Sequence, residues 1–287
     1  MATLSYARVR HSDLAPVYDR RMDVKPLVSV ITPVRDRARF IETCLVSVLS
    51  QDYPNIEHFI VDGLSTDGTL EIIRKYAARY PDRIKYITES DKSSGDAWNK
   101  GMKLCHGEIL GWLGADDTYK PHAVATAVEF FEKHPEAYFL HGGCDFIDEQ
   151  GKVTGHAFNR DFDMHEALTD ATFIATTSVF YKKRVVEVVG VTDTREIGVD
   201  TDFWIRIGKQ FHIYRTDAVL SNFRFHKEGV TANGNRLYAR EGYRVARRHG
   251  GGIFTLRGLR VLIYETRIFV WLLPLLAPLY RKWRNLK

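Results

Sequence analysis

The sequence predicts an α/β protein built on a doubly wound, mostly parallel sheet. In its first half, short apolar runs rich in β-branched residues, typical of buried strands, alternate with segments of helical periodicity. Helices long enough to cross back over a sheet indicate βαβ units, in which the strands run parallel. The chain has 287 residues, of which 45% are hydrophobic and 27% charged, so one large domain with its own core is expected.

The elements of the first half follow from local patterns. Residues 27–32 (LVSVIT) form an apolar, β-branched run, and Phe40, Cys44 and Val48 then recur at helical spacing. Turn-forming residues at 63–68 separate the next strand from the next helix. The predicted order is strand 27–32, helix 40–49, strand 56–61, helix 70–80, strand 84–87, helix 96–105, strand 109–113 and helix 122–134.

The second half is less regular, and its predicted elements are mostly shorter. We expect strands at 138–140, 144–147 and 213–225, and helices at 184–189, 203–208 and 236–249. Gly250-Gly251-Gly252 is the clearest linker signal in the chain. The predicted organisation is an irregular arm at 1–26, two halves of one domain at 27–120 and 121–235, and a basic, amphipathic helical tail at 236–287.

Charge is distributed unevenly along the chain. Its net charge is +5, but residues 236–287 alone carry +10, which leaves −5 on residues 1–235. An acidic body argues against a broad nucleic-acid surface, so we expect no nucleic-acid partner.

The sequence also suggests a compartment. Cys44, Cys105 and Cys144 lack metal-ligand spacing and are interpreted as reduced thiols. Residues 1–26 have no signal-peptide apolar core, and the apolar run 268–280 is short and contains two prolines. These features predict a cytoplasmic protein without a membrane-spanning helix.

Polar residues follow four successive predicted strands, at 32–35, 62–67, 89–96 and 114–117. Ligands of open parallel sheets bind outside the carboxyl ends of the strands, so these segments should meet in one crevice. The sequence has neither a GxxxxGK[ST] phosphate loop nor a GxGxxG turn after the first strand, so a nucleotide there would need its phosphates held in another way.

Two strand ends carry candidate ligands, each with a structural alternative. Asp116 and Asp117, in GWLGADD, supply hard oxygen ligands suited to Mg²⁺ or Mn²⁺, although Asp also favours caps and turns. Asp62 is placed to accept a hydrogen bond from a base. For Ser65, Thr66 and Asp67 a helix-start turn is the favoured interpretation.

The stretches LVSVITPVRDR, IVDGLSTDGT, SDKSSGDAWNKGM and GWLGADD occur in this order and together resemble the nucleotide-binding half of family 2 inverting glycosyltransferases of the GT-A fold. A looser resemblance covers 198–228, with GVDTDFWIR and FRFH. The resemblance implies a GT-A-like, single Rossmann-like domain. It also implies inverting transfer of a sugar from a nucleoside diphosphate donor, with a UDP-sugar favoured, to an acceptor hydroxyl.

The resemblance further implies a role for each matching residue. By this resemblance, Thr32, Pro33 and Arg35 line the nucleoside pocket and Asp62 contacts the base. Asp91, Asp96 and Lys100 belong to the donor-binding residues, and Asp116 faces the ribose. Asp117 binds the metal, His226 is a candidate further metal ligand, and Asp200 is the catalytic base.

Inverting transfer requires these residue types. A metal and cations offset the charge that gathers on the leaving diphosphate, and a carboxylate takes the proton of the attacking hydroxyl. Val199 stands where the family often has Glu, which leaves Asp202 as an alternative base, and Leu64 replaces a residue that is often small. Trp98, Trp112 and Trp204 either stack on sugar or pack in the core, with core packing favoured for at least two.

The tail suggests membrane association. Basic residues border the apolar, aromatic-bearing segment 254–283, a pattern suited to an anchor lying in an anionic membrane surface through residues 253–287. The alternative is a helix docked on the body or in a dimer interface. An anchored, peripheral enzyme on the inner face of the cell membrane would act on a lipid-linked or growing saccharide, in polysaccharide, lipopolysaccharide or glycolipid biosynthesis.

Two other classes share part of this pattern. A sugar-nucleotide-forming nucleotidyltransferase is disfavoured because no Gly-rich basic loop follows the first strand. A non-catalytic nucleotide- or glycan-binding module is disfavoured because Asp62, Asp116, Asp117 and Asp200 are all present.

Overall fold

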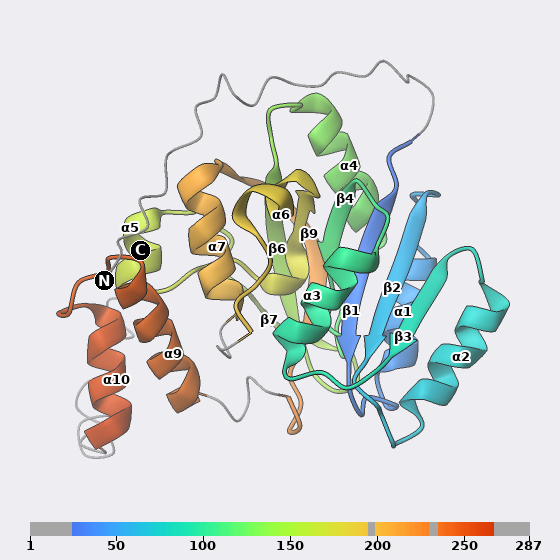
Figure 1. The fold of residues 1–287 in the computed structure, drawn as a ribbon, viewed down its shortest axis with the longest axis horizontal. Coiled ribbons are helices and arrows are strands. Elements are labelled where there is room, and N and C mark those ends of the chain that lie inside the picture. The colour runs from blue at the N-terminus through green and yellow to red at the C-terminus, as the bar shows by residue number, and fades with distance from the viewer. Residues whose placement is uncertain (1–24, 195–198, 230–234, 267–287) are drawn as a thin grey trace.

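A computed structural model describes residues 25–194, 199–229 and 235–266, which form one curved sheet with helices on both faces (Figure 1). The strand order is β3-β2-β1-β4-β8-β6-β9-β5, and β7 pairs with β6 outside this path. The strands are β1 Val28–Val34, β2 Ile56–Asp62, β3 Ile84–Thr88, β4 Ile109–Trp112, β5 Thr118–Tyr119, β6 Phe139–Ile147, β7 Val153–His156, β8 Val179–Lys182 and β9 Ile213–Arg224.

The sheet is mostly parallel, as predicted. β1 pairs in parallel with β2 and β4, and β2 pairs in parallel with β3. β8 is antiparallel to both β4 and β6, so β6 regains the direction of the first four strands, and β9 runs parallel to β6. The remaining short strands, β5 and β7, pair antiparallel with β9 and β6.

Helices cover both faces, which confirms the doubly wound arrangement. α1, α2 and α4 pack on one face, while α3, α6 and α7 pack on the other. The helices are α1 Ile41–Leu49, α2 Thr69–Arg79, α3 Ser94–Leu104, α4 Ala123–Lys133, α5 Met164–Thr169, α6 Arg184–Val189, α7 Val199–Gln210, α9 Asn235–Arg248 and α10 Leu256–Thr266, with a short 3₁₀ helix, η2, at Thr176–Ser178.

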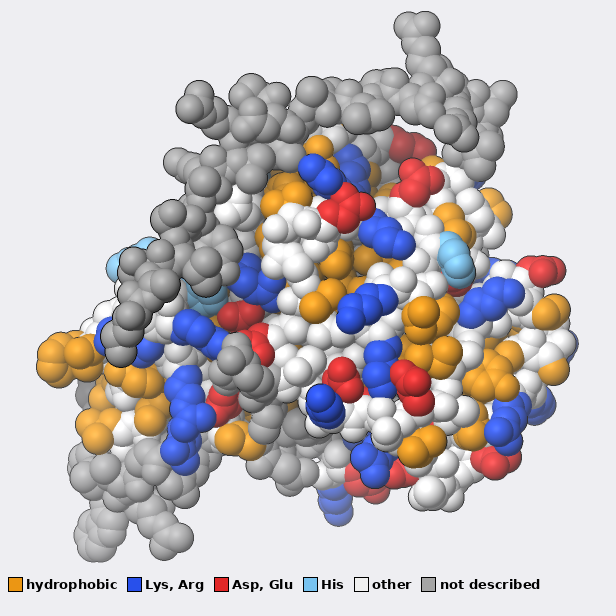
Figure 2. Space-filling model, in the orientation of Figure 1, with side chains coloured by type: hydrophobic (Ala, Val, Ile, Leu, Met, Phe, Trp, Pro, Cys, Tyr) orange, Lys and Arg blue, Asp and Glu red, His pale blue; other side chains and the backbone are white. Residues whose placement is uncertain are grey.

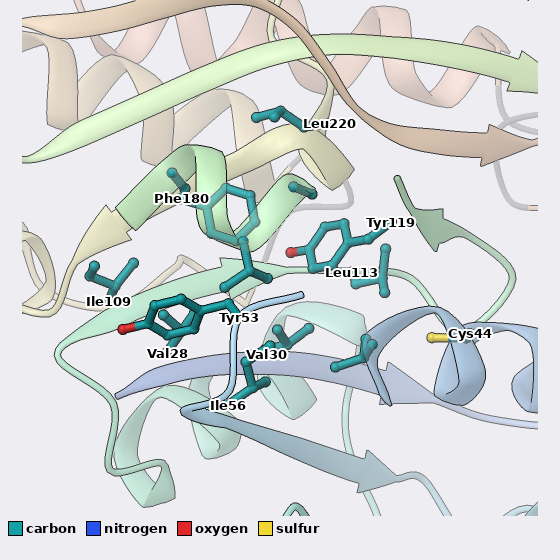
Figure 3. Close-up of a cluster of buried hydrophobic side chains, with 14 of the residues drawn as sticks. Val28, Val30, Cys44, Tyr53, Ile56, Ile109, Leu113, Tyr119, Phe180 and Leu220 are labelled. Carbon is teal, nitrogen blue, oxygen red and sulfur yellow. The ribbon is translucent and has the colours of Figure 1, made fainter. Parts of the chain in front are cut away.

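The two cores follow from strand alternation. In β1, Val28 and Val30 point into the core beside α1, where Figure 3 shows them with Cys44 and Ile56, whereas Ile31 joins the core on the opposite face. Both faces of β1 and β2 are buried, so apolar residues occupy both faces of these strands, and the buried Glu57 and His58 of β2 bond to Ser29 and Thr32 of β1.

Several second-half elements differ from the predictions. The strands predicted at 138–140 and 144–147 are one strand, β6, because the intervening Gly142 and Gly143 stay extended with irregular register against β9. A Cβ at Gly142 would lie 2.6 Å from the Leu220 side chain, so close strand approach, not a turn, requires this glycine. The predicted helix 203–208 is α7, which begins at Val199. The sequence analysis did not predict β5, β7, β8 or α5.

The described part of the tail is docked on the domain. Val245 of α9 packs with Ala167 of α5 and Ile205 of α7. The glycine run is not a flexible linker: Gly250 has φ +97°, and the buried Gly251 donates its N–H to the Ala246 carbonyl at 2.8 Å. It forms a tight turn between α9 and α10, and this corrects the linker interpretation.

Other predictions about the tail and the thiols have mixed outcomes. Among the described residues, none of the helices is both long and apolar enough to cross a bilayer. Residues 1–24 of the arm predicted at 1–26 lie outside the described residues, as does the run 268–280. All three cysteines are buried and free, as predicted. The division of the chain into two halves and a tail stays a prediction.

Candidate functional site

A cavity of about 390 Å³ opens where the loops after β1 and β4 meet η2, α7 and the end of β9. Its volume lies in the range of small-ligand sites, roughly 300–1,000 Å³. Seven of the predicted site residues line it: Pro33, Arg35, Asp91, Asp116, Asp117, Asp200 and His226.

The loops after β1 and β2 are fastened to each other. Asp36, in the left-handed conformation with φ +50°, accepts the Thr66 N–H at 2.8 Å and donates its own N–H to Ser65 Oγ at 2.9 Å. Asp67 accepts the N–H groups of Ala38 and Thr69. Ser65, Thr66 and Asp67 therefore act in a turn that starts α2, the interpretation that the sequence favoured.

Asp91 lies against this pair of loops and lines the cavity. A Cβ at Gly63 would come within 2.3 Å of its Oδ2, so a side chain there would displace the Asp91 carboxylate. Burial raises the pKa of Asp91, although the nearby Lys100 and Arg35 oppose the shift.

Four predicted donor-site residues do not line the cavity. Thr32 is buried, with its hydroxyl 2.9 Å from Nε2 of His58. Asp62 is fully buried and accepts the Thr88 hydroxyl at 2.7 Å. Asp96 and Lys100 bond locally: Asp96 Oδ2 accepts the Lys92 N–H, and Lys100 Nζ lies 3.0 Å from Glu89 Oε1. Their predicted roles in donor contact stay predictions.

Asp116 and Asp117 are held by groups from β9 and beyond. Asp117 is only 3% exposed and accepts the Arg224 N–H at 2.8 Å, while Arg224 Nε donates to the Asp116 carbonyl at 2.8 Å. Oδ2 of Asp116 lies 2.7 Å from Nε2 of His226 and 3.6 Å from Nε of Arg37. Burial, and then the charge of Asp116, raise the pKa of Asp117 well above its usual range.

This pair fits a divalent cation. A buried carboxylate beside another carboxylate is stabilised in its charged form by a nearby cation. The described residues contain no cluster of three or more His, Cys, Asp or Glu arranged to hold a metal. Mg²⁺ commonly takes one or two carboxylates plus substrate phosphates, so two carboxylates would be enough if a diphosphate supplied further ligands. The predicted role of Asp117 as a metal ligand stays a prediction.

His226 is engaged with Asp116 through Nε2, and its buried Nδ1 has no hydrogen-bond partner within the part of the chain that the structure describes. In this structure it holds the Asp116 carboxylate. Its predicted role as a metal ligand stays a prediction.

Asp200 projects into the cavity from the first turn of α7. Its Oδ2 accepts the Thr176 hydroxyl at 2.8 Å and its Oδ1 accepts the Thr201 N–H at 2.7 Å. Two donors on one side orient a carboxylate, as a general base requires.

Asp202, the alternative base, does not line the cavity. It is 4% exposed and is bonded to Arg206 Nε and His249 Nε2, both at 2.8 Å. Burial would raise its pKa, but the bonds from His249 and Arg206 lower it overall. Asp202 therefore joins α7 to His249 beyond α9, whereas Asp200 faces the cavity; the role of Asp200 as the base stays a prediction.

Residues 29–190 match the family model described as glycosyl transferase family 2, and residues 112–286 match the one described as glycosyl transferase family group 2. The chain belongs to glycosyl transferase family 2.

Two relatives show that the chain matches only a part of longer proteins. The O-antigen biosynthesis protein RfbC of Myxococcus xanthus is 33% identical over 193 residues, which are 66% of this chain and 15% of that protein. Chondroitin synthase of Escherichia coli is 27% identical over 206 residues, 72% of this chain and 30% of that protein. The chain thus spans less than a third of either relative.

Solved structures confirm the GT-A fold of this family 2 chain. The mannosyltransferase PcManGT of Pyrobaculum calidifontis, in complex with GDP-Man and Mn²⁺, has a TM-score of 0.64 and 21% identity, covering 89% of this chain and 74% of that one. S. aureus TarS 1–349, in complex with UDP-GlcNAc, has a TM-score of 0.62 and 17% identity, covering 85% and 73%.

Sequence reasoning missed part of the cavity wall of this glycosyltransferase family member. Trp98, Trp112 and Trp204 are all buried, so the favoured core packing is confirmed, although the first two also reach the cavity. Of the residues missed, Arg37 stood in the quoted motif LVSVITPVRDR, and Phe223, Arg224 and Phe225 stood in FRFH, whereas Thr176, Thr177 and Tyr238 stood in none. The missed lining residues include Arg37, Thr176, Thr177, Phe223, Arg224, Phe225 and Tyr238.

Proposed function

We propose that the chain is an inverting glycosyltransferase that moves a sugar from a nucleoside diphosphate donor to an acceptor hydroxyl. The observation that carries the proposal is that Asp116 and Asp117 share one cavity with Asp200. The reaction needs carboxylates in two roles, one beside the leaving diphosphate and one beside the attacking hydroxyl.

In this mechanism Asp200 accepts the acceptor's hydroxyl proton while that oxygen bonds to the anomeric carbon and the bond from this carbon to the diphosphate oxygen breaks. The Thr176 hydroxyl and the Thr201 N–H hold the Asp200 carboxylate in place. Asp116 and Asp117 would hold Mg²⁺ or Mn²⁺, which when bound would offset the charge of the leaving diphosphate. Arg37, 3.6 Å from Asp116, places a further positive charge on this side.

The donor is proposed to be a UDP-sugar. The support is the TarS neighbour, whose title names UDP-GlcNAc, although the PcManGT title names GDP-Man. The names of the relatives, an O-antigen biosynthesis protein and a chondroitin synthase, support a role in polysaccharide biosynthesis, with a growing or lipid-linked saccharide as the acceptor.

A nucleotide-dependent thermal shift tests the donor site. We expect UDP with Mn²⁺ or Mg²⁺ to raise Tm more than UDP with EDTA, because the ion joins the diphosphate to Asp116 and Asp117. A ligand at 100 times its Kd adds about 2.7 kcal/mol to stability, which is readily measured. GDP, CDP and dTDP serve as controls for the base; equal shifts with all four would contradict the UDP proposal, and no shift would contradict the donor site.

We also propose that the α10 region contacts an anionic membrane. Large apolar side chains are exposed there, and Phe254 is fully exposed. Figure 2 shows hydrophobic side chains gathered at the left edge, over α10, with Lys and Arg side chains beside them. An apolar stripe beside basic residues suits the headgroup region of an anionic bilayer. The exposed apolar residues are Ile253, Phe254, Leu256, Leu259 and Leu262.

Sedimentation with phosphatidylglycerol vesicles tests this contact in the full chain. Phe254→Glu with Leu259→Glu should abolish co-sedimentation, because it places negative charge on the apolar surface. Val153→Glu, at a β7 residue of similar exposure to Leu259, is the matched control and should bind as the unaltered protein does. Unchanged sedimentation of the double variant would contradict the proposal.

A further inference from the structure

Arg224, the last residue of β9, is only 6% exposed, although it lines the cavity. Among the described residues, its guanidinium bonds to main-chain carbonyls and to no carboxylate. Nε donates to the Asp116 carbonyl at 2.8 Å, and Nη1 donates to those of Asp148 and Glu149 at 3.0 and 3.2 Å. Burying a charged group without an ion pair costs free energy, which favours a role for these bonds beyond stability.

The main chain of Arg224 acts on the second aspartate of the pair. Its N–H donates to Oδ1 of Asp117 at 2.8 Å, so one residue holds both the Asp117 carboxylate and the Asp116 carbonyl. The guanidinium is fixed in turn by the Phe40 ring, whose centroid lies 5.2 Å away, and by the turn between β6 and β7. Both aspartates are thereby joined to β9 and to this turn.

The carboxylate oxygens that these bonds leave open lie close to each other. Oδ2 of Asp116 is bonded to His226, and Oδ1 of Asp117 is bonded to Arg224. Within the described ranges, Oδ1 of Asp116 and Oδ2 of Asp117 accept no hydrogen bond. Both lie beside Gly114, because a Cβ on this glycine would be 3.1 Å from the first oxygen and 2.6 Å from the second.

Two carboxylates do not keep this arrangement unaided. Like charges repel, and an Asp side chain can rotate about two bonds, so an unheld pair would turn apart. The N–H of Arg224 engages one oxygen of Asp117 and leaves the other directed toward Asp116. One open oxygen from each carboxylate, directed to the same place, is the arrangement that a shared divalent cation requires.

We propose that Arg224 is the positioning residue of the diphosphate end of the cavity: its hydrogen bonds to Asp116 and Asp117 turn one oxygen of each carboxylate toward a common divalent cation. The inference rests on the proposed function, in which these carboxylates hold Mg²⁺ or Mn²⁺. It goes further by assigning their orientation to a residue remote in sequence, and by making its hydrogen-bond geometry, not its charge, the property that matters.

Mn²⁺ titrations followed by electron paramagnetic resonance test the inference without turnover. Free Mn²⁺ is measured as the ion is added to the full-length protein, in the presence of UDP and in its absence. Arg224→Lys keeps the positive charge but loses the planar fork that bonds to several carbonyls. We expect it to weaken Mn²⁺ binding about ten-fold or more, the usual effect of losing a group that orients a metal ligand. UDP affinity in EDTA should be unchanged.

Arg83→Lys is the matched control. Arg83 is also partly buried and donates to main-chain carbonyls, those of Leu49 at 3.0 Å and Val48 at 3.4 Å, but it does not line the cavity. This variant should bind Mn²⁺ as the unaltered protein does, even if both substitutions lower Tm.

Gly114→Ala tests the same geometry without altering Arg224. The nearest atoms to the added methyl group belong to the side chains of Asp116 and Asp117, so the methyl displaces their oxygens and not the backbone. The variant should therefore fold and bind Mn²⁺ more weakly. If Arg224→Lys does not fold, Gly114→Ala decides the test.

Each alternative result has a definite meaning. Mn²⁺ binding by Arg224→Lys as tight as that of the unaltered protein would overturn the inference, because charge alone would then suffice. Equal weakening in Arg83→Lys, loss of UDP affinity in EDTA by Arg224→Lys, or full Mn²⁺ binding by Gly114→Ala would overturn it as well. Mn²⁺ binding that depends on Arg224, without transfer from any nucleotide sugar, would support the inference while the proposed function fails. An unaltered protein that binds no Mn²⁺ would overturn both.

Discussion

The two predicted halves of the domain, 27–120 and 121–235, hold their candidate site residues in different ways. In the donor half, the loops after β1 and β2 are fastened to each other through Asp36 and Asp67, and Asp117 is held from outside that half by Arg224. In the acceptor half, Asp200 is held within its own half by Thr176 and Thr201. The donor carboxylates thus depend on packing between the halves, whereas the proposed base does not.

The substitution with the largest expected effect, Asp200→Asn, alters only the predicted acceptor half. Asp200→Asn should lower sugar transfer by about 10²–10⁴-fold, the contribution of a positioned general base, because the amide cannot take the hydroxyl proton. Donor binding should be unchanged, since Asp200 lies outside the Asp116–Asp117 pair. UDP release in the presence of acceptor and calorimetric UDP binding measure the two quantities; undiminished transfer would refute the assignment of the base.

The matching change in the donor half is Asp117→Asn. It should lower the Mn²⁺-dependent gain in UDP affinity by about ten-fold or more, because an ion binds a neutral amide more weakly than a carboxylate. Titrations with Mn²⁺ and with EDTA measure that gain. Asp67→Asn, in the same half but outside the cavity lining, is the control; a full metal-dependent gain in Asp117→Asn would show that the halves do not divide the work as proposed.

Thr176→Val sharpens the account of the acceptor half. We expect transfer to fall about ten-fold, as measured by UDP release, because the Asp200 carboxylate loses a donor that orients it. Thr176→Ser keeps the hydroxyl and should restore transfer. Equal losses in Thr176→Val and Thr176→Ser would indicate a packing role alone.

Each predicted half contains a buried histidine that makes the stability of the domain depend on pH. Burial, and then Arg83, lower the pKa of His58 in β2 to about 3; burial, and then Arg215, lower that of His141 in β6 to about 4. Because the unfolded chain binds these protons near pH 6.5, stability falls as the pH drops from there toward the folded-state values, by roughly 1.4 kcal/mol per pH unit for each histidine.

Of these two histidines, only His141 should be replaceable without a loss of stability. Its ring nitrogens have no hydrogen-bond partner among the described residues, whereas His58 bonds to Thr32. His141→Leu should therefore reduce the loss of stability between about pH 6.5 and 4, as followed by urea unfolding across that range. The exposed His165→Leu is the control, and an unaltered pH dependence in His141→Leu would contradict the buried neutral state.

The smallest expected effect concerns the donor loops. Leu64 is 52% exposed and adopts φ +61°, a conformation that costs a non-glycine residue roughly 1–2 kcal/mol. Leu64→Gly removes that strain but adds chain entropy to the unfolded state, so a net gain of about 0.5–1 kcal/mol in urea unfolding is expected. Gly68→Ala, at φ +99°, should have the opposite sign; a destabilised Leu64→Gly would show that the side chain packs usefully.

The donor half could be predicted from sequence because parallel strands end at one edge. Strand ends therefore mark the site, and Arg35, Asp91, Asp116 and Asp117 do line the cavity. A residue's position at a strand end is easier to predict than its exposure to the cavity. Asp62 also stands at a strand end, but its carboxylate is buried against Thr88.

The acceptor half was less predictable for physical reasons. β8 is a four-residue strand whose partners come from β4 and β6, so only long-range pairing defines it. The start of α7 was missed because its first turn contains Asp200 and Asp202 and has no apolar repeat. Acidic residues in a first turn do favour a helix N-terminus, and this was the available signal. Thr176 carries no local signal, because its importance arises from its hydrogen bond to Asp200, which is distant in sequence.

The bond between His249 and Asp202 bears on how this protein can be re-engineered. His249, just beyond α9, supplies a partner for a buried carboxylate one turn or less from Asp200, and α10 then folds back over that region through the turn at Gly250 and Gly251. A chimera that exchanges the C-terminal segment at the triple glycine would keep His249 but lose the contact of Arg257 with the Ala167 carbonyl. A fusion point beyond α10 preserves the contacts of both His249 and Arg257. Chimeras that exchange acceptor or membrane specificity should therefore keep α9 and α10 together with the rest of the domain.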